Sequence, residues 1–155
     1  MRIFKVKFIL FTLVILLALV GCQDKPKVKL TTISGKEYSL NAMTGKWIII
    51  NYWATWCAPC RKEIPELNKL AKEHSANVQV FGMSFDPLTR EVLQAAIKKM
   101  QIQFPNLVDN PMYAFGINQL TGLPATLIIS PQGKFYKLLY GPQTQKKLLA
   151  LLKIK

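Results

Sequence analysis

The order of apolar and amphipathic segments predicts an α/β fold with a central mixed β-sheet flanked by helices. An isoleucine-rich run at 47–53 is followed by apolar residues at helical spacing and then by a second apolar run at 78–85, which indicates a β-α-β unit. Two later segments, 125–129 and 134–140, are separated by a Pro- and Gly-containing turn and predict a strand pair. Together these observations predict a sheet of four or five strands.

The remaining segments predict the elements around this sheet. Residues 28–40 contain a Ser-Gly turn between two short strand patterns, which indicates an N-terminal β-hairpin added to the core. Asp86, followed by proline, is expected to cap a helix with one apolar face that extends to about Met100. A short helical piece is expected at 110–115, and a helix at 144–152 closes the chain.

Two cysteines lie where the first strand gives way to a helical pattern. Cys57 is expected at the helix N-terminus, where free backbone N–H groups and the helix dipole favour a thiolate over a thiol. Cys60 follows one turn later and is close enough to attack a mixed disulfide formed at Cys57. We therefore predict a redox pair in which Cys57 is the nucleophile and Cys60 the resolving cysteine.

Other uses of a Cys-x-x-Cys pair fit the sequence less well. A disulfide that closes so short a loop removes little entropy from the unfolded chain, so a purely structural role is a poor explanation. Zinc needs about four ligands, whereas the chain has three cysteines and one histidine. Covalent haem attachment needs a histidine directly after the second cysteine, and Arg61 occupies that position. We expect neither a metal nor a cofactor.

The segment from Trp53 to Pro65, Trp-Ala-Thr-Trp-Cys-Ala-Pro-Cys-Arg-Lys-Glu-Ile-Pro, resembles the active-site segment of thioredoxin-like proteins, particularly the membrane-tethered TlpA/ResA type. The resemblance implies a thioredoxin-like fold for residues 30–155 and a thiol:disulfide oxidoreductase activity. It also implies that Trp56 and Pro59, which flank the cysteines, belong to the substrate-binding surface.

A second segment carries the same resemblance. Leu123 and Pro124 precede an apolar strand and are similar to the loop whose cis proline faces the cysteine pair in thioredoxin-like proteins. The resemblance implies that the backbone of Leu123 pairs with an incoming extended chain, as in strand addition. An ordinary turn proline before a strand is the alternative.

Cys60 must lose its proton before it can attack, and the sequence offers one candidate for the base. Asn51 occupies the position of the buried aspartate of thioredoxins and cannot titrate. By resemblance to the tethered relatives, Asp86 takes this part, although its role could be helix capping alone. Glu63 and its charged neighbours are expected to be solvated helix residues.

The N-terminus predicts export. Residues 1–21 combine basic residues with a 13-residue apolar run and are typical of a signal peptide. The run ends in Gly-Cys and resembles a lipobox, which implies that Cys22 becomes a lipid-modified N-terminus; an uncleaved anchor with a free cysteine is the alternative. Residues 22–29 are then a short polar tether, and the domain faces the periplasm or the exterior of a bacterial cell.

The overall prediction is a membrane-anchored thiol:disulfide oxidoreductase that acts as a monomer. Its expected partners are protein thiols and disulfides and a membrane electron donor. The family resemblance suggests that the protein reduces disulfides, for example those of apocytochrome c, whose cysteines must be free for haem attachment. Although the net charge is +13, the basic residues are spread along the chain, and no stripe with interleaved aromatics predicts nucleic-acid binding.

Three alternatives remain. One is a disulfide-forming oxidant with the same cysteine pair, because related proteins span about −270 to −120 mV. A thiol peroxidase would share the fold, but the residues before Cys57 lack its Pro-x-x-x-Thr/Ser-x-x-Cys pattern. A copper chaperone would need wider cysteine spacing and a distal histidine.

Overall fold

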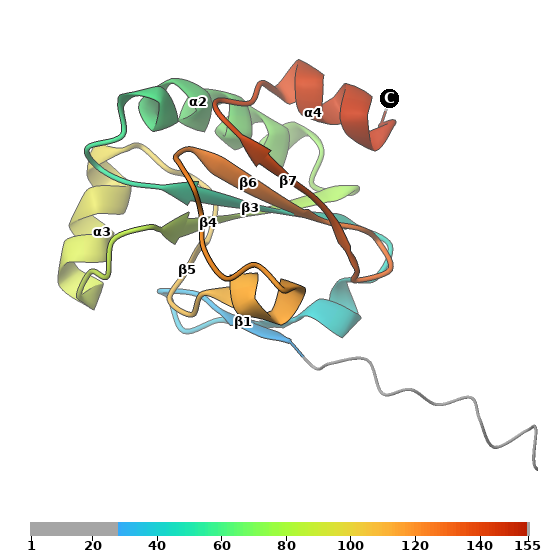
Figure 1. Cartoon of the computed structure of the whole chain (residues 1–155), viewed down its shortest axis with the longest axis horizontal. Coiled ribbons are helices and arrows are strands. Elements are labelled where there is room, and N and C mark those ends of the chain that lie inside the picture. The colour runs from blue at the N-terminus through green and yellow to red at the C-terminus, as the bar shows by residue number, and fades with distance from the viewer. Residues whose placement is uncertain (1–27, 155) are drawn as a thin grey trace, which may run out of the picture.

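The computed structural model describes residues 28–154; the predicted signal peptide, Cys22 and most of the tether lie outside the described residues. Its centre is a five-stranded mixed sheet with the strand order β5-β4-β3-β6-β7 (Figure 1). The strands are β3 (Trp47–Trp53), β4 (Val78–Ser84), β5 (Asn106–Leu107), β6 (Ala125–Ile129) and β7 (Phe135–Tyr140).

Strand β3 is the middle of the sheet, and six of its seven residues are buried. It runs parallel to β4 and antiparallel to β6, with Tyr52 opposite Ala125. Because β6 runs antiparallel to β3, the first residues of β6 lie beside the last residues of β3, at the same end of the strands. The loop before β6 is therefore brought to the loop after β3.

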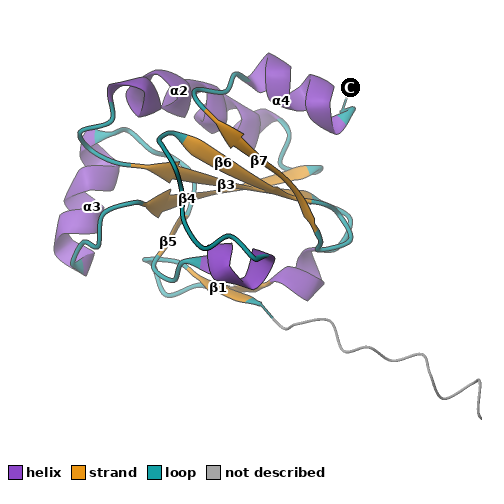
Figure 2. Cartoon of the chain, in the orientation of Figure 1, coloured by secondary structure: helices purple, strands orange, loops and turns teal. Residues whose placement is uncertain are grey.

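The two faces of the sheet are covered differently (Figure 2). Helices α2 and α4 lie on one face, α3 packs into the same apolar cluster, and a two-stranded antiparallel sheet with two 3-10 helices lies on the other. These elements are α2 (Ala58–Glu73), α3 (Arg90–Lys99), α4 (Gln145–Leu152), β1 (Lys29–Thr31), β2 (Glu37–Ser39), η1 (Leu40–Met43) and η2 (Pro111–Phe115).

Alternation along the central strands divides the core into two clusters. Ile49 and Ile128 point towards the helices, whereas Ile48, Ile50 and Leu127 point towards the hairpin side. All five side chains are essentially inaccessible to solvent. A strand buried on both faces explains why the sequence of β3 is almost continuously apolar.

Most predicted elements are confirmed, including the hairpin with its turn at Gly35, which has the positive φ of 84° that favours glycine. The predicted start of α3 is wrong. Thr89, not Asp86, is the N-cap, and its hydroxyl accepts a hydrogen bond from the N–H of Val92 at 3.4 Å. The short strand β5 was not predicted, because two residues carry no readable period.

Candidate active site

Cys57 and Cys60 lie at the junction of β3 and α2, as predicted, and form a disulfide. Cys57 is the N-cap residue of α2, and its Sγ accepts a hydrogen bond from the N–H of Cys60 at 3.2 Å. The same N–H would stabilise a thiolate after reduction. Cys57 is 4% exposed and Cys60 0%. An incoming sulfur can therefore reach Cys57 only.

An exposed aromatic pair stands beside the disulfide. Trp56 is 61% exposed, and its ring meets that of Phe85 edge to face, with centroids 6.3 Å apart. The indole Nε1 of Trp56 donates a hydrogen bond to Asp86 Oδ2 at 2.9 Å. Asp86 therefore contacts the residue before Cys57, and its side chain is occupied there rather than in capping α3.

The loop before β6 completes this edge of the sheet. The Leu123–Pro124 peptide bond is cis, as expected from the resemblance. Leu123 packs against the apolar cluster that contains Cys57 and Cys60. The strand pairing that places Tyr52 opposite Ala125 holds this loop and the cysteine loop together.

Glu63 is the residue that sequence reasoning placed wrongly. It was expected in solvent, but it is 1% exposed. Asn51 donates to its Oε1 through Nδ2 at 2.6 Å, and the N–H of Gln143 donates to its Oε2 at 2.9 Å. Burial outweighs these two hydrogen bonds and raises the pKa of Glu63 to about 7.

A sequence signal for this burial did exist. Glu63 lies three residues after Cys60 and belongs to the same helical stripe as Ile64, Leu67 and Leu70, all of them buried. A carboxylate within the apolar stripe of a helix is expected to face the core. Cys60 and Glu63 are one turn apart on the buried face of α2, so a carboxyl group with a pKa of about 7 lies one turn from the cysteine that we predict to be the resolving one.

Two buried polar atoms of the central sheet have no hydrogen-bond partner among the described residues. They are Asn51 Oδ1 and Thr126 Oγ1, which belong to directly opposed residues of β3 and β6. Both residues are 0% exposed. Unpaired buried polar atoms are costly, and each calls for an explanation such as a catalytic role or a bound water. Asn51 also bonds to Glu63 of α2, so the buried polar groups of the two strands and of α2 lie together.

Other ligand-binding and membrane features were sought in residues 28–154. No group of three or more His, Cys, Asp or Glu side chains in this range is placed to hold a metal ion. In the same range, none of the helices has the length and apolar character needed to cross a bilayer.

This geometry defines a thioredoxin-like protein with a disulfide at the start of the first long helix. The chain belongs to the AhpC/TSA family, whose family model matches residues 22–137. The cysteine pair and the relatives described next make it a thiol:disulfide oxidoreductase.

Its sequence is similar to that of the thioredoxin-like protein YneN of Bacillus subtilis, at 33% identity over 131 residues, which cover 81% of this chain and 75% of YneN. Thiol-disulfide oxidoreductase ResA of Bacillus cereus is 29% identical over 127 residues, which cover 81% of this chain and 73% of ResA.

Among solved structures, the fold is similar to that of a thiol:disulfide interchange protein of the thioredoxin family from Chlorobium tepidum. The TM-score is 0.68 at 28% identity, and the match covers 83% of this chain and 92% of that one. StoA from Bacillus subtilis gives a TM-score of 0.63 at 25% identity, covering 79% and 96% of the two chains. The predicted thioredoxin-like fold is thereby confirmed.

Proposed function

We propose that the reduced protein reduces disulfides of other proteins outside the cytoplasm. The Cys57 thiolate attacks one sulfur of the substrate disulfide, which forms a mixed disulfide and releases the first substrate thiolate. Cys60, once deprotonated, attacks Cys57 Sγ and releases the second thiolate. The protein pair gives up two electrons and becomes the Cys57–Cys60 disulfide, and the substrate gains two thiols after protonation.

The buried carboxylate of Glu63 is the observation that carries this proposal. Cys60 is fully buried, so its proton needs an acceptor within the protein. A carboxylate whose pKa is raised to about 7 can take up that proton and release it again at neutral pH. Glu63 is the better candidate for this step because Asp86 is more exposed and hydrogen-bonded to Trp56. Asp86 then acts through Trp56, by holding it beside Cys57.

The substrate is proposed to bind across the edge formed by the two loops. Trp56 offers an exposed apolar surface on one side of Cys57, and Pro59 lies between the cysteines. On the other side, the backbone of Leu123, before the cis Pro124, can pair with an extended substrate chain.

The leader supports the rest of the proposal. Residues 1–21 would direct export, and Cys22 would carry the lipid that holds the domain at the membrane. The tether from Cys22 to Lys29 would keep the cysteine pair near the bilayer, where a membrane protein could return electrons to it. Apocytochrome c thiols are the substrate class that the family resemblance suggests.

The reduction potential of the Cys57–Cys60 pair tests the direction of the reaction. Equilibration with dithiothreitol is expected to give a potential of about −270 mV, the value for thioredoxin. A value near −120 mV, typical of strong oxidants, would instead make the protein a disulfide-forming oxidant. A separate trapping experiment tests the roles of the two cysteines. When mixed with a disulfide substrate, Cys60→Ser should form a stable mixed disulfide with it, whereas Cys57→Ser should form none.

A further inference from the structure

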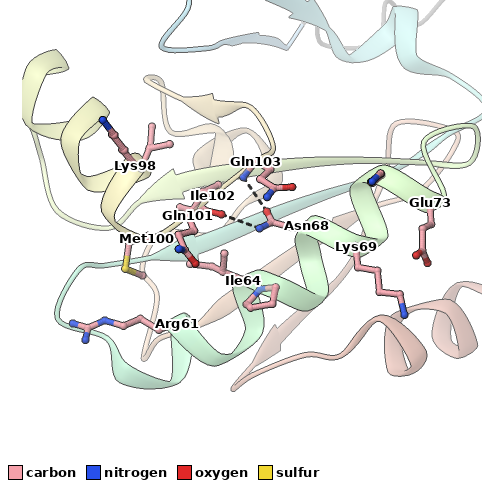
Figure 3. A pocket seen from close by; sticks show the side chains of 13 residues that line it. Arg61, Ile64, Asn68, Lys69, Glu73, Lys98, Met100, Gln101, Ile102 and Gln103 are labelled. Atoms are coloured by element: carbon pink, nitrogen blue, oxygen red, sulfur yellow. Dashed lines mark hydrogen bonds between the residues drawn. The ribbon is translucent and has the colours of Figure 1, made fainter.

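A cleft of about 740 Å³ opens between α2 on one side and the end of α3 with the segment that follows it on the other (Figure 3). Its α2 wall begins at Arg61, the residue directly after Cys60. Several apolar side chains line it, namely Ile64, Pro65, Ile97, Met100 and Ile102. The cleft therefore starts next to the redox pair and has an apolar lining.

The charges around this cleft are mostly of one sign. Four exposed cations line it, namely Arg61, Lys69, Lys72 and Lys98. The carboxylate among the lining residues is that of Glu73, and its Oε2 accepts a hydrogen bond from Gln145 Nε2 at 2.8 Å. Across residues 28–154 the structure contains a single ion pair, Lys29–Glu37, so the four cations are not neutralised within the described part of the chain. A hollow with unbalanced cations concentrates the field and attracts anionic groups.

Hydrogen bonds fix the two walls relative to each other. Asn68, on α2, donates through Nδ2 to the carbonyl of Gln101 at 2.8 Å and accepts through Oδ1 from the N–H of Gln103 at 2.9 Å (Figure 3). Gln101 has a φ of 57°, a left-handed conformation that this clamp supports. The cleft is thus preformed, which lowers the entropy cost of binding.

We propose that this cleft docks an acidic segment, with apolar side chains among its acids, of the proteins whose disulfides are exchanged at Cys57. The inference rests on the proposed function and adds a class of partner to it. Carboxylates of the segment would lie against the cations, and its apolar side chains would cover Ile64 and Met100. Because Arg61 follows Cys60 directly, a chain held in the cleft keeps its own cysteines close to Cys57.

The position of the cleft favours a protein segment over a lipid surface. The described chain begins at Val28, just before β1, and β1 lies on the face of the sheet opposite α2 (Figure 1). If the domain is tethered to a membrane through its N-terminus, the chain therefore enters it on the face opposite to the cleft. A concave, clamped surface also fits an inserted chain better than a flat bilayer.

The test uses the full-length protein, reduced and held in a non-ionic detergent. Three synthetic peptides carry the same internal disulfide followed by a leucine-containing segment. The other residues of this segment are all glutamate in the first peptide, all glutamine in the second and all lysine in the third. One turnover is followed by the fluorescence change of the protein, with no added reductant. We expect the glutamate peptide to react about tenfold faster than the glutamine peptide, and the difference to shrink as salt is added. Equal rates for the three peptides would overturn the proposal.

Charge-reversal variants locate the effect. The double variant Lys69→Glu/Lys98→Glu is expected to lose the preference for the glutamate peptide. The control Lys134→Glu/Lys137→Glu makes the same charge change at exposed residues in and before β7, away from the cleft, and should keep it. Loss of the preference in both double variants would indicate a general effect of net charge and would contradict the assignment to the cleft.

Two further measurements separate the possible failures. A small uncharged disulfide, 2-hydroxyethyl disulfide, should react equally with all variants. If it does not react with the wild-type protein, the proposed function itself is wrong; if it reacts while the peptides are not distinguished, only the docking proposal is wrong. Equal peptide rates, combined with a loss of preference for phosphatidylglycerol over phosphatidylcholine vesicles in Lys69→Glu/Lys98→Glu, would assign the cleft to lipid instead.

Discussion

Replacing Glu63 by Gln removes the buried titrating group while keeping its shape. In the wild-type protein the two oxygens of Glu63 accept hydrogen bonds from Asn51 and Gln143. A glutamine keeps one oxygen for Gln143. Its amide can donate to Asn51 Oδ1, which has no partner in the wild-type structure, if the Asn51 amide turns over. The variant is therefore expected to fold with hydrogen bonds to both Asn51 and Gln143 retained.

The size of the effect follows from the pKa. The ordinary value of 4.5 is raised to about 7 in the folded protein, so the folded state holds the proton more tightly than the unfolded state. The wild-type free energy of unfolding should therefore fall as the pH rises from about 4.5 through 7, by about 3 kcal/mol at ~1.36 kcal/mol per pKa unit. The free energy of unfolding of Glu63→Gln should not show this fall, because glutamine does not titrate. The two proteins should have similar stability near pH 4.5, and the variant should be more stable above pH 7.

Urea unfolding of the oxidised proteins at a series of pH values measures this difference, because disulfide cysteines do not titrate. A wild-type stability that runs parallel to that of Glu63→Gln across this range would refute the buried acid. Glu66→Gln is the matched control, since Glu66 on the same helix accepts a hydrogen bond from the N–H of Gln145. It reports the cost of weakening the α2–α4 contact alone. In the reduced protein, Glu63→Gln should also slow the resolving step by about a hundredfold.

Three other substitutions test the surroundings of the site. Gly82→Ala would place a Cβ 2.9 Å from Cγ of Asn106 and closer still to its Oδ1, and the overpacking should destabilise the protein by about 1–3 kcal/mol in urea unfolding. Thr126→Val removes a buried hydroxyl without a partner and should raise the free energy of unfolding by about 1 kcal/mol. Asp86→Asn keeps an oxygen that can accept from Trp56, so it should leave both the fold and disulfide exchange at neutral pH essentially unchanged.

Each of these has an outcome that contradicts it. Gly122 has open space where its Cβ would be, so Gly122→Ala is the control for Gly82, and equal stability losses would disprove the steric argument. A destabilised Thr126→Val would show that the hydroxyl has a partner, such as a buried water. Slower exchange in Asp86→Asn would show that the Asp86 carboxylate itself takes part in proton transfer, which contradicts the assignment of that step to Glu63 alone.

The sequence predicts the sheet and the cysteine pair because both depend on local patterns. A run of isoleucines indicates a buried strand, and Cys-x-x-Cys at a strand-to-helix junction indicates that Cys57 lies at the N-terminus of the helix. The start of α3 could not be fixed in this way. Asp86 and Thr89 are both acceptable N-caps, and the indole of Trp56, thirty residues earlier, decides between them by binding Asp86.

The burial of Glu63 depends on contacts even more distant in the chain. The atoms that surround its carboxylate come from Asn51 on β3 and from Gln143, which is eighty residues away. Its place in the apolar stripe of α2 indicates that it faces inward, but neither the hydrogen bonds nor the raised pKa can be derived from spacing. The cleft beside Arg61 is hidden in the same way, because Lys98 reaches it from another helix.

The segment from Gln143 through α4 makes hydrogen bonds to the glutamates of α2 and so affects the environment of Glu63. Three carboxylates of α2 accept hydrogen bonds from the residues at and just before the start of α4. Glu63 accepts from the N–H of Gln143, whereas Glu66 and Glu73 accept from the backbone and the side chain of Gln145. A protein shortened before Gln143 would keep both cysteines and the whole central sheet. Its Glu63 would then lose a donor and much of its cover, and the carboxylate would titrate more like one in water. In the proposed mechanism the C-terminal segment thus helps to keep Glu63 buried, and a fusion or truncation at that end is expected to change the pH dependence of disulfide exchange.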